Sequence, residues 1–114
     1  MIKIKRIYEP LGSDDGCRIL VDRLWPRGIS KENAHVDLWM KDIAPSADLR
    51  KWFSHDPAKW NDFVSRYQEE LKDKSNLLEE IERLNKAHGN VTLLFSARDT
   101  DHSNATALLQ TLNN

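Results

Sequence analysis

The chain predicts an α/β fold, a small single domain over residues 1–114 with a largely parallel sheet flanked by helices. Strand-like apolar runs alternate with segments of helical periodicity. The run at residues 91–95 is almost entirely apolar, as in strands that are buried on both faces of a parallel sheet. A length of 114 residues suffices for one hydrophobic core but is too short for two.

The first third of the chain predicts two strands and two loops. Residues 2–8 alternate between apolar and basic positions, which is typical of a strand with one wetter face. Residues 9–16 are rich in Pro, Gly, Ser and Asp and predict a loop. Residues 17–21 form an apolar run that indicates a strand buried on both faces, and residues 22–33 are predicted as a second loop.

The middle of the chain predicts helices with identifiable starts. Residues 35–42 favour a short helix that carries Leu38 and Trp39 inward. Ser46 can cap a following helical turn. Asp56, followed by a proline at the first helical position, predicts the next helix start. The apolar positions behind it recur at three- and four-residue steps, as on the core-facing side of a helix: Trp60, Phe63, Val64, Tyr67 and Leu71.

The last third predicts a helix, a strand and a final helix. A break near Ser75 leads into a helix that Gly89 can close in a left-handed conformation. Residues 91–95 are the third strand. Thr100 or Asp101 is the expected cap of the last helix. Its inward positions are Ala105, Leu108, Leu109 and Leu112.

The run Asp-Arg-Leu-Trp-Pro-Arg-Gly at residues 22–28 follows the second strand directly. A turn uses the proline and the glycine to redirect the backbone, but it does not require Arg23, Trp25 and Arg27 beside them. Guanidinium groups bind carboxylate or phosphate through paired N–H donors and also stack on flat rings. The run therefore predicts a recognition loop for a ligand that is anionic, planar or both.

A second polar run, from Ser96 to His102, follows the strand at residues 91–95. Ligands of open α/β sheets bind beyond the carboxyl ends of the parallel strands. If the two strands are parallel neighbours, both runs open onto one crevice. The charged residues that would gather there are Asp22, Arg23, Arg27, Arg98, Asp99 and His102.

Two interpretations of these charges are open. In the structural one, Asp22 pairs with Arg98, and Asp99 pairs with Arg23, as plain salt bridges. In the catalytic one, Asp22 or Asp99 orients or activates water. His102 then transfers a proton, because histidine titrates near neutral pH.

Three further residues have two interpretations each. His55 either binds the ligand or is a loop residue at a helix start, and Trp25 either walls a pocket or covers the sheet edge. Cys17 and Arg23 have the C-x5-R spacing of cysteine phosphatases. The residues between them read as a strand without glycine, whereas that chemistry needs a loop of backbone amides. Cys17 is therefore predicted to be a core residue.

Composition excludes several classes of protein. One cysteine cannot form an internal disulfide, and neither a metal site nor a cofactor is predicted. A net charge of −1 gives no strong nucleic-acid signature. No apolar run approaches the roughly 18 residues of a membrane span, and no signal-peptide core follows the first residues. A cytoplasmic location with no membrane contact is expected by elimination, and no oligomeric state is predicted.

Several runs of the sequence resemble one bacterial family in order and over nearly the whole chain. They are VDRLWPRG (21–28), APS (44–46), LRKWF (49–53), HDP (55–57), and TLLFSA (92–97) with Asn104-Ala105. This pattern is similar to domain-of-unknown-function family 488, in its YeaO-like branch. The resemblance implies a small cytosolic α/β domain of unknown function.

The resemblance also bears on the catalytic interpretation. Members of that branch often have Lys in place of Arg98, which keeps the charge. Some have amides in place of Asp99 and His102, and those members lack this acid–base pair. The present chain keeps both titratable residues, as a potentially active subset would.

The sequence therefore leaves three candidate functions, of which a hydrolase is the preferred one. It would act on a nucleotide-, nucleoside- or base-like ligand in the crevice, where the arginines bind the anionic part. The second is a non-catalytic module that binds such a ligand or a nucleic-acid end through the arginines and Trp25. The third is an interaction protein that docks an acidic partner.

Overall fold

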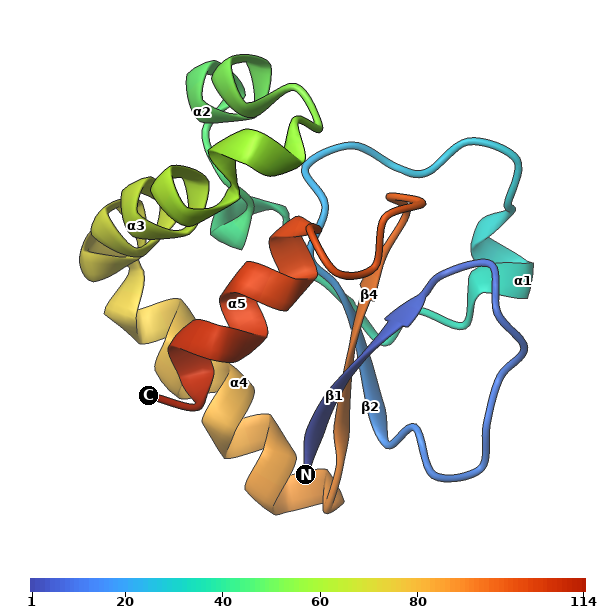
Figure 1. Cartoon of the computed structure of the whole chain (residues 1–114). Helices are drawn as coiled ribbons and strands as arrows, with labels where there is room; N and C mark the ends of the chain where they lie inside the picture. The colour runs from blue at the N-terminus through green and yellow to red at the C-terminus, as the bar shows by residue number, and fades with distance from the viewer.

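The computed structural model describes residues 1–114 and contains one four-stranded sheet (Figure 1). Its strands are β1 (Ile2–Arg6), β2 (Cys17–Leu20), β3 (Leu38–Trp39) and β4 (Val91–Phe95). They lie in the order β1-β4-β2-β3, and every neighbouring pair is parallel. The predicted α/β class with a largely parallel sheet is confirmed.

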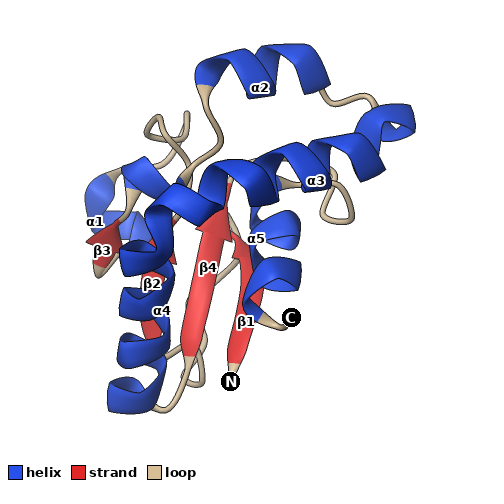
Figure 2. Cartoon of the chain, turned by 90° about the vertical axis from the view of Figure 1, so that its left-hand side faces the viewer, coloured by secondary structure: helices blue, strands red, loops and turns tan.

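Three helices cover one face of the sheet, as Figures 1 and 2 show. They are α3 (Trp60–Leu71), α4 (Ser75–His88) and α5 (Asn104–Leu112). The short helix α1 (Lys31–Ala34) lies at the other face, and α2 (Ala47–Phe53) stands beyond the carboxyl ends of the strands. Single 3-10 turns at Lys41–Ile43, Pro57–Lys59 and Lys72–Lys74 join these elements. None of the helices has both the length and the apolarity that crossing a bilayer requires.

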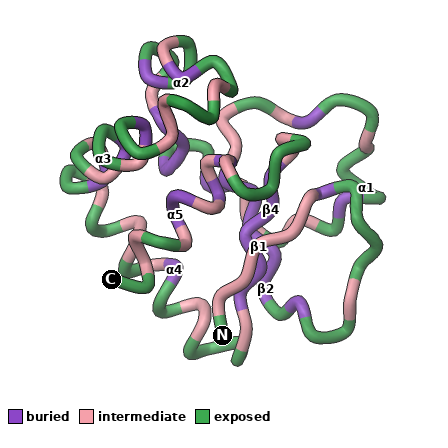
Figure 3. Tube along the Cα trace, in the orientation of Figure 1, coloured by how far each residue is buried: buried purple, intermediate pink, exposed green.

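The sheet separates a large core from a small one. In β4, Leu93 and Phe95 belong to the main core between the sheet and the long helices. Leu94 lies in a smaller cluster with Leu20 and Ala34, on the side of α1. All five residues of β4 are buried (Figure 3). Because alternate side chains enter opposite cores, apolar residues are favoured at consecutive positions of this strand.

Three predicted helix boundaries are confirmed. The Ser46 hydroxyl accepts the Leu49 N–H at 3.1 Å at the start of α2. Asp56 accepts the Ala58 N–H at 3.0 Å before the 3-10 turn that leads into α3. Gly89 follows α4 with φ +81°. The fully buried members of the predicted α3 stripe are Phe63, Tyr67 and Leu71.

The helix predicted over residues 35–42 is wrong, because this stretch forms the edge strand β3 and a 3-10 turn. The Asp37 N–H donates to the Arg18 carbonyl, and the Met40 N–H donates to the Leu20 carbonyl, both at 2.9 Å. These acceptors belong to the free edge of β2. A pattern within residues 35–42 cannot indicate that this edge lies beside them. The short helix α1 comes earlier and begins inside the loop predicted over residues 22–33.

The cap predicted for the last helix is also wrong. Neither Thr100 nor Asp101 caps it, and the Ser103 hydroxyl accepts the Thr106 N–H at 3.1 Å instead. The reason lies in Asp99, whose carboxylate accepts the Asp101 N–H at 3.0 Å and folds the preceding residues into a separate turn. The helix can begin only after that turn.

Ser103→Ala is expected to lower the free energy of unfolding by about 1 kcal/mol, the usual effect of losing an N-cap hydroxyl. The hydroxyl belongs to a buried residue, so water cannot replace it easily. Asp101→Ala is the control and is expected to change stability by less than about 0.5 kcal/mol. Urea unfolding followed by circular dichroism measures both values. Equal losses in the two variants would contradict the assignment of the cap.

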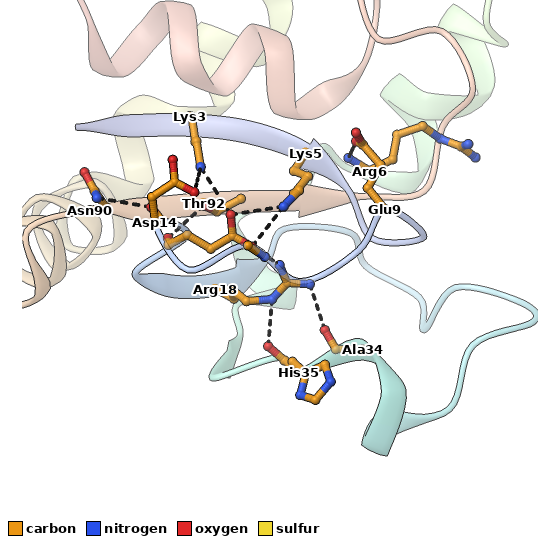
Figure 4. A network of polar contacts seen from close by, with 12 residues as sticks. Lys3, Lys5, Arg6, Glu9, Asp14, Arg18, Ala34, His35, Asn90 and Thr92 are labelled. Atoms are coloured by element: carbon orange, nitrogen blue, oxygen red, sulfur yellow. Dashed lines mark hydrogen bonds and ion pairs between the residues drawn. The ribbon is translucent and has the colours of Figure 1, made fainter.

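A buried ion cluster occupies the amino-terminal half of the sheet, on the side of α1 (Figure 4). Asp15 is 1% exposed and Arg18 is 3% exposed, and they form an ion pair. Lys3 and Lys5 contact the same carboxylate at 3.2 and 3.1 Å. Burial raises the pKa of Asp15, but hydrogen bonds from the Gly12 N–H and these three cations outweigh burial and hold the pKa well below its usual range. The charges of this cluster are satisfied within the protein.

Candidate functional site

A cavity of about 740 Å³ lies beyond the carboxyl ends of β2 and β4. Three parts of the chain supply most of its lining: residues 22–27 after β2, residues 96–97 and 102–104 from the end of β4 to the start of α5, and residues 44–55 in and around α2. The volume falls in the range typical of small-molecule sites. The cavity also lies where ligands of parallel α/β sheets bind.

Asp22 joins the ends of the two central strands at this cavity. One of its carboxylate oxygens accepts hydrogen bonds from the Ser96 N–H at 3.0 Å and from the Ser96 hydroxyl at 2.8 Å. The other oxygen accepts from the Asn104 side-chain amide at 3.1 Å. The same amide donates to the Val21 carbonyl at 3.1 Å. Asp22 therefore holds the loop after β2 against the start of α5.

Burial raises the pKa of Asp22, although the hydrogen bonds from Ser96 and Asn104 and the charge of Arg50 act in the opposite direction. Both carboxylate oxygens are occupied by donors from the protein. Neither structural salt bridge considered from the sequence forms, because Asp22 binds these neutral donors and Asp99 pairs with His102.

Four cationic side chains line the cavity: Arg23, Arg27, Arg50 and Lys51. Asp22 is the only carboxylate in the lining. None of the four forms an ion pair or donates a side-chain hydrogen bond within the protein, and the buried Nε of Arg23 has no partner. By contrast, Arg18 has its charge paired at the other end of the sheet. The cavity therefore has an excess of positive charge that the protein leaves uncompensated.

Trp25 lines the cavity and also packs against the sheet edge, so the structure combines the two roles considered for it. Its ring lies edge-on to Trp39 of β3, with 5.5 Å between the centroids. Its indole N–H donates to the Ile29 carbonyl at 2.8 Å. These contacts fix the plane of the ring, as a stacking surface in a binding site requires.

His102 lines the cavity, whereas Asp99 and Arg98 are exposed and do not. The His102 Nδ1 is 2.8 Å from an Asp99 carboxylate oxygen. This hydrogen bond is the main reason why the pKa of Asp99 lies below its usual value. The His102 ring also lies edge-on to Trp60, at 5.2 Å between centroids. Two contacts thus set the orientation of this imidazole.

His55 lies at the end of α2 and lines the cavity. It and the preceding Ser54 have φ values of +56° and +46°, a left-handed conformation that non-glycine residues rarely adopt. The His55 ring is 6.5 Å from that of Phe53, a buried residue of α2. The turn therefore positions His55 at the cavity, and no ion pair holds its side chain.

Cys17 is a core residue, as predicted, at 5% exposure in β2. Burial raises the pKa of its thiol, the opposite of what a thiolate nucleophile requires. The structure brings no three side chains of His, Cys, Asp or Glu together at the spacing of a metal site.

Sequence reasoning assigned no role to Arg50, Lys51, Ser96 and Asn104, which all line the cavity. Arg50 and Lys51 follow the cap at Ser46 by about one helical turn, so their exposure could have been predicted. Their position over the cavity depends on where α2 packs. The Ser96 and Asn104 contacts to Asp22 span 74 and 82 residues of sequence.

The chain is similar to known proteins over nearly its whole length. The model of the family DUF488-N3i, described as the inactive DUF488-N3 subclade, matches residues 1–114. The uncharacterized protein Rv3073c of Mycobacterium tuberculosis (strain ATCC 25618 / H37Rv) is 45% identical over 114 residues, covering 98% of this chain and 93% of that protein. The uncharacterized protein YeaO of Escherichia coli (strain K12) is 40% identical over 107 residues, with coverages of 94% and 92%. No solved structure shows a significant match. The resemblance predicted from the sequence is confirmed.

Proposed function

Since this chain belongs to DUF488-N3i, the inactive DUF488-N3 subclade, we propose that it binds an anionic, nucleotide-like small molecule without transforming it. The description of the subclade as inactive favours binding over the hydrolase that the sequence placed first. It agrees with the geometry of Asp22, whose two carboxylate oxygens already accept hydrogen bonds from Ser96 and Asn104. A carboxylate held in this way is a poor candidate for activating water.

The observation that carries the proposal is the set of unpaired cations in one concave site. Arg23, Arg27, Arg50 and Lys51 line the cavity without a protein counter-ion. A buried Nε without an acceptor, such as that of Arg23, costs free energy unless a ligand or water supplies one. Phosphate oxygens are strong acceptors for guanidinium groups. An anionic ligand would therefore satisfy groups that the protein leaves unsatisfied.

The ring-bearing part of the ligand is inferred from the aromatic side chains of the lining. Tyr8, Trp25, Phe53 and His55 contribute flat surfaces at the same cavity as the cations. Guanidinium planes can also stack on a base. The site is concave, which favours a small molecule over the flat charged face that docking to an acidic protein partner would use.

A hydrolase is the second candidate because of one observation. His102 lines the cavity while its Nδ1 is hydrogen-bonded to the Asp99 carboxylate, and such a pair can orient an imidazole as a general base. This alternative would be established if the wild type converts a bound nucleotide and His102→Ala still binds that nucleotide but does not convert it. We expect instead that chromatography recovers the nucleotide unchanged after incubation with the wild type.

The binding test is a thermal-shift screen followed by isothermal titration calorimetry. The ligands are the monophosphates and diphosphates of adenosine, guanosine, cytidine and uridine. At least one is expected to bind the wild type, and Arg27→Ala combined with Arg50→Ala is expected to raise its Kd by about tenfold or more, because hydrogen bonds between charged groups are lost. Lys86→Ala removes a positive charge outside the cavity, at an exposed position in the last turn of α4; it is the control and is expected to bind normally. Absence of binding by every nucleotide would refute the proposal.

A further inference from the structure

We infer that the ligand carries two adjacent anionic groups, as in the diphosphate of a nucleoside, and that it bridges α2 and the loop after β2. This inference rests on the proposed function and specifies its ligand class. Arg23 and Arg27 would bind one phosphoryl group. Arg50 and Lys51 would bind the other.

The four cations come in two pairs from separate parts of the chain. Arg23 and Arg27 lie in the loop that follows β2, and Arg50 and Lys51 lie on α2. A single phosphoryl group that is bound closely by one pair leaves the charge of the other pair uncompensated. Two linked phosphoryl groups can compensate both pairs at once. The distribution of charge therefore favours a diphosphate over a monophosphate.

The protein itself does not tie these two segments together. No hydrogen bond or ion pair joins residues 22–27 to residues 47–55. Both segments nevertheless line the same cavity, so their side chains face a common space. The four cations outnumber the one carboxylate of the lining, so the cavity carries a net positive charge. An anion that bridges the two segments would compensate this charge on both sides.

Helix α2 is attached to α3 at both of its ends, so a contact between α2 and the loop after β2 is left for a ligand to make. Its base is fixed to α3 because the Ser46 hydroxyl and N–H donate to Glu70 at 2.6 and 2.9 Å. Phe53 at its other end stacks on Phe63, with 4.3 Å between centroids. Both attachments lead to α3, and the side of α2 that carries Arg50 and Lys51 faces the cavity without a polar contact to the loop.

The test compares ADP with AMP, and likewise each other nucleoside as its diphosphate and monophosphate, by calorimetry. The variants are Arg27→Ala, Lys51→Ala and their combination, with Lys86→Ala as control. Both changed side chains are exposed and make no polar contact, so the variants are expected to fold normally. The diphosphate is expected to bind the wild type about tenfold more tightly than the monophosphate. Each single variant is expected to weaken diphosphate binding by about tenfold. The monophosphate is expected to lose affinity in only one of the two single variants, the one that changes the pair of cations to which it binds.

Other outcomes separate the inference from the proposed function. Equal affinity for the monophosphate and the diphosphate, with both weakened by Arg27→Ala, would overturn the inference and leave the proposed function intact. A 5′-phosphorylated dinucleotide that binds more tightly than every diphosphate would overturn it in favour of a nucleic-acid end. If no nucleotide binds, the proposed function itself fails.

Discussion

Asp15→Ala is expected to lower the free energy of unfolding by about 3 kcal/mol, because it removes the counter-ion of a buried arginine. Arg18 is 3% exposed, and the other hydrogen bonds of its guanidinium go to the neutral carbonyls of His35 and Ala34. The variant would also leave the Gly12 N–H without its present acceptor. Urea unfolding at neutral pH measures the loss.

Asp14→Ala is the matched control for this prediction. Asp14 is adjacent in sequence and pairs with Lys3 at 3.3 Å, but its side chain is 78% exposed. Surface ion pairs contribute little, so the control is expected to lose less than about 1 kcal/mol. A similar loss in both variants would show that burial of the cluster is not what makes Asp15 important.

The effect of Asp15 is also expected to depend on pH. Its pKa in the folded protein lies below that of an unfolded aspartate, so folding favours the ionised form. The stabilisation is therefore present above about pH 4 and is lost as the pH falls toward the folded-state pKa. The difference in stability between wild type and Asp15→Ala should narrow from neutral pH to about pH 3. A difference that widens on acidification would contradict the sign of this shift.

Phe53→Ala is expected to lower the free energy of unfolding by about 3–5 kcal/mol, the usual effect of removing a buried aromatic ring. Phe53 is 5% exposed and lies in a row of rings with Trp60 at 6.0 Å and Phe63 at 4.3 Å. The same ring attaches the end of α2 to α3 and lines the cavity. The variant is therefore expected to weaken ligand binding as well as stability.

Lys51→Ala separates these two effects on the same helix. Lys51 is exposed and makes no polar contact within the protein, so its removal is expected to change stability by less than about 0.5 kcal/mol. Calorimetric unfolding and nucleotide titration of the two variants give the comparison. If Lys51→Ala destabilised the protein as much as Phe53→Ala, a loss of binding in Lys51→Ala could not be attributed to its charge.

The sequence alone determined the α/β class, three of the four strands and most helix starts, because these depend on interactions between near neighbours. The burial of β4 on both faces can be predicted from its five consecutive residues, which are almost all apolar. The caps at Ser46 and Asp56 accept hydrogen bonds from residues at most three positions further along the chain. It also determined the resemblance to the family, and it placed the candidate site at the charged runs that directly follow β2 and β4.

Only the tertiary structure decided which partners these residues have. β3 exists because the edge of β2 offers hydrogen-bonding groups to a segment about 19 residues away in the chain. Asp22 holds Ser96 and Asn104 instead of an arginine, and Arg50 and Lys51 reach the cavity because α2 packs on α3 beyond the sheet. Charge and secondary-structure propensity are properties of single residues. Whether two charges pair depends on the distance between them, which only the folded structure determines. The unpaired state of the cavity's cations could therefore be recognised only after every carboxylate had been placed.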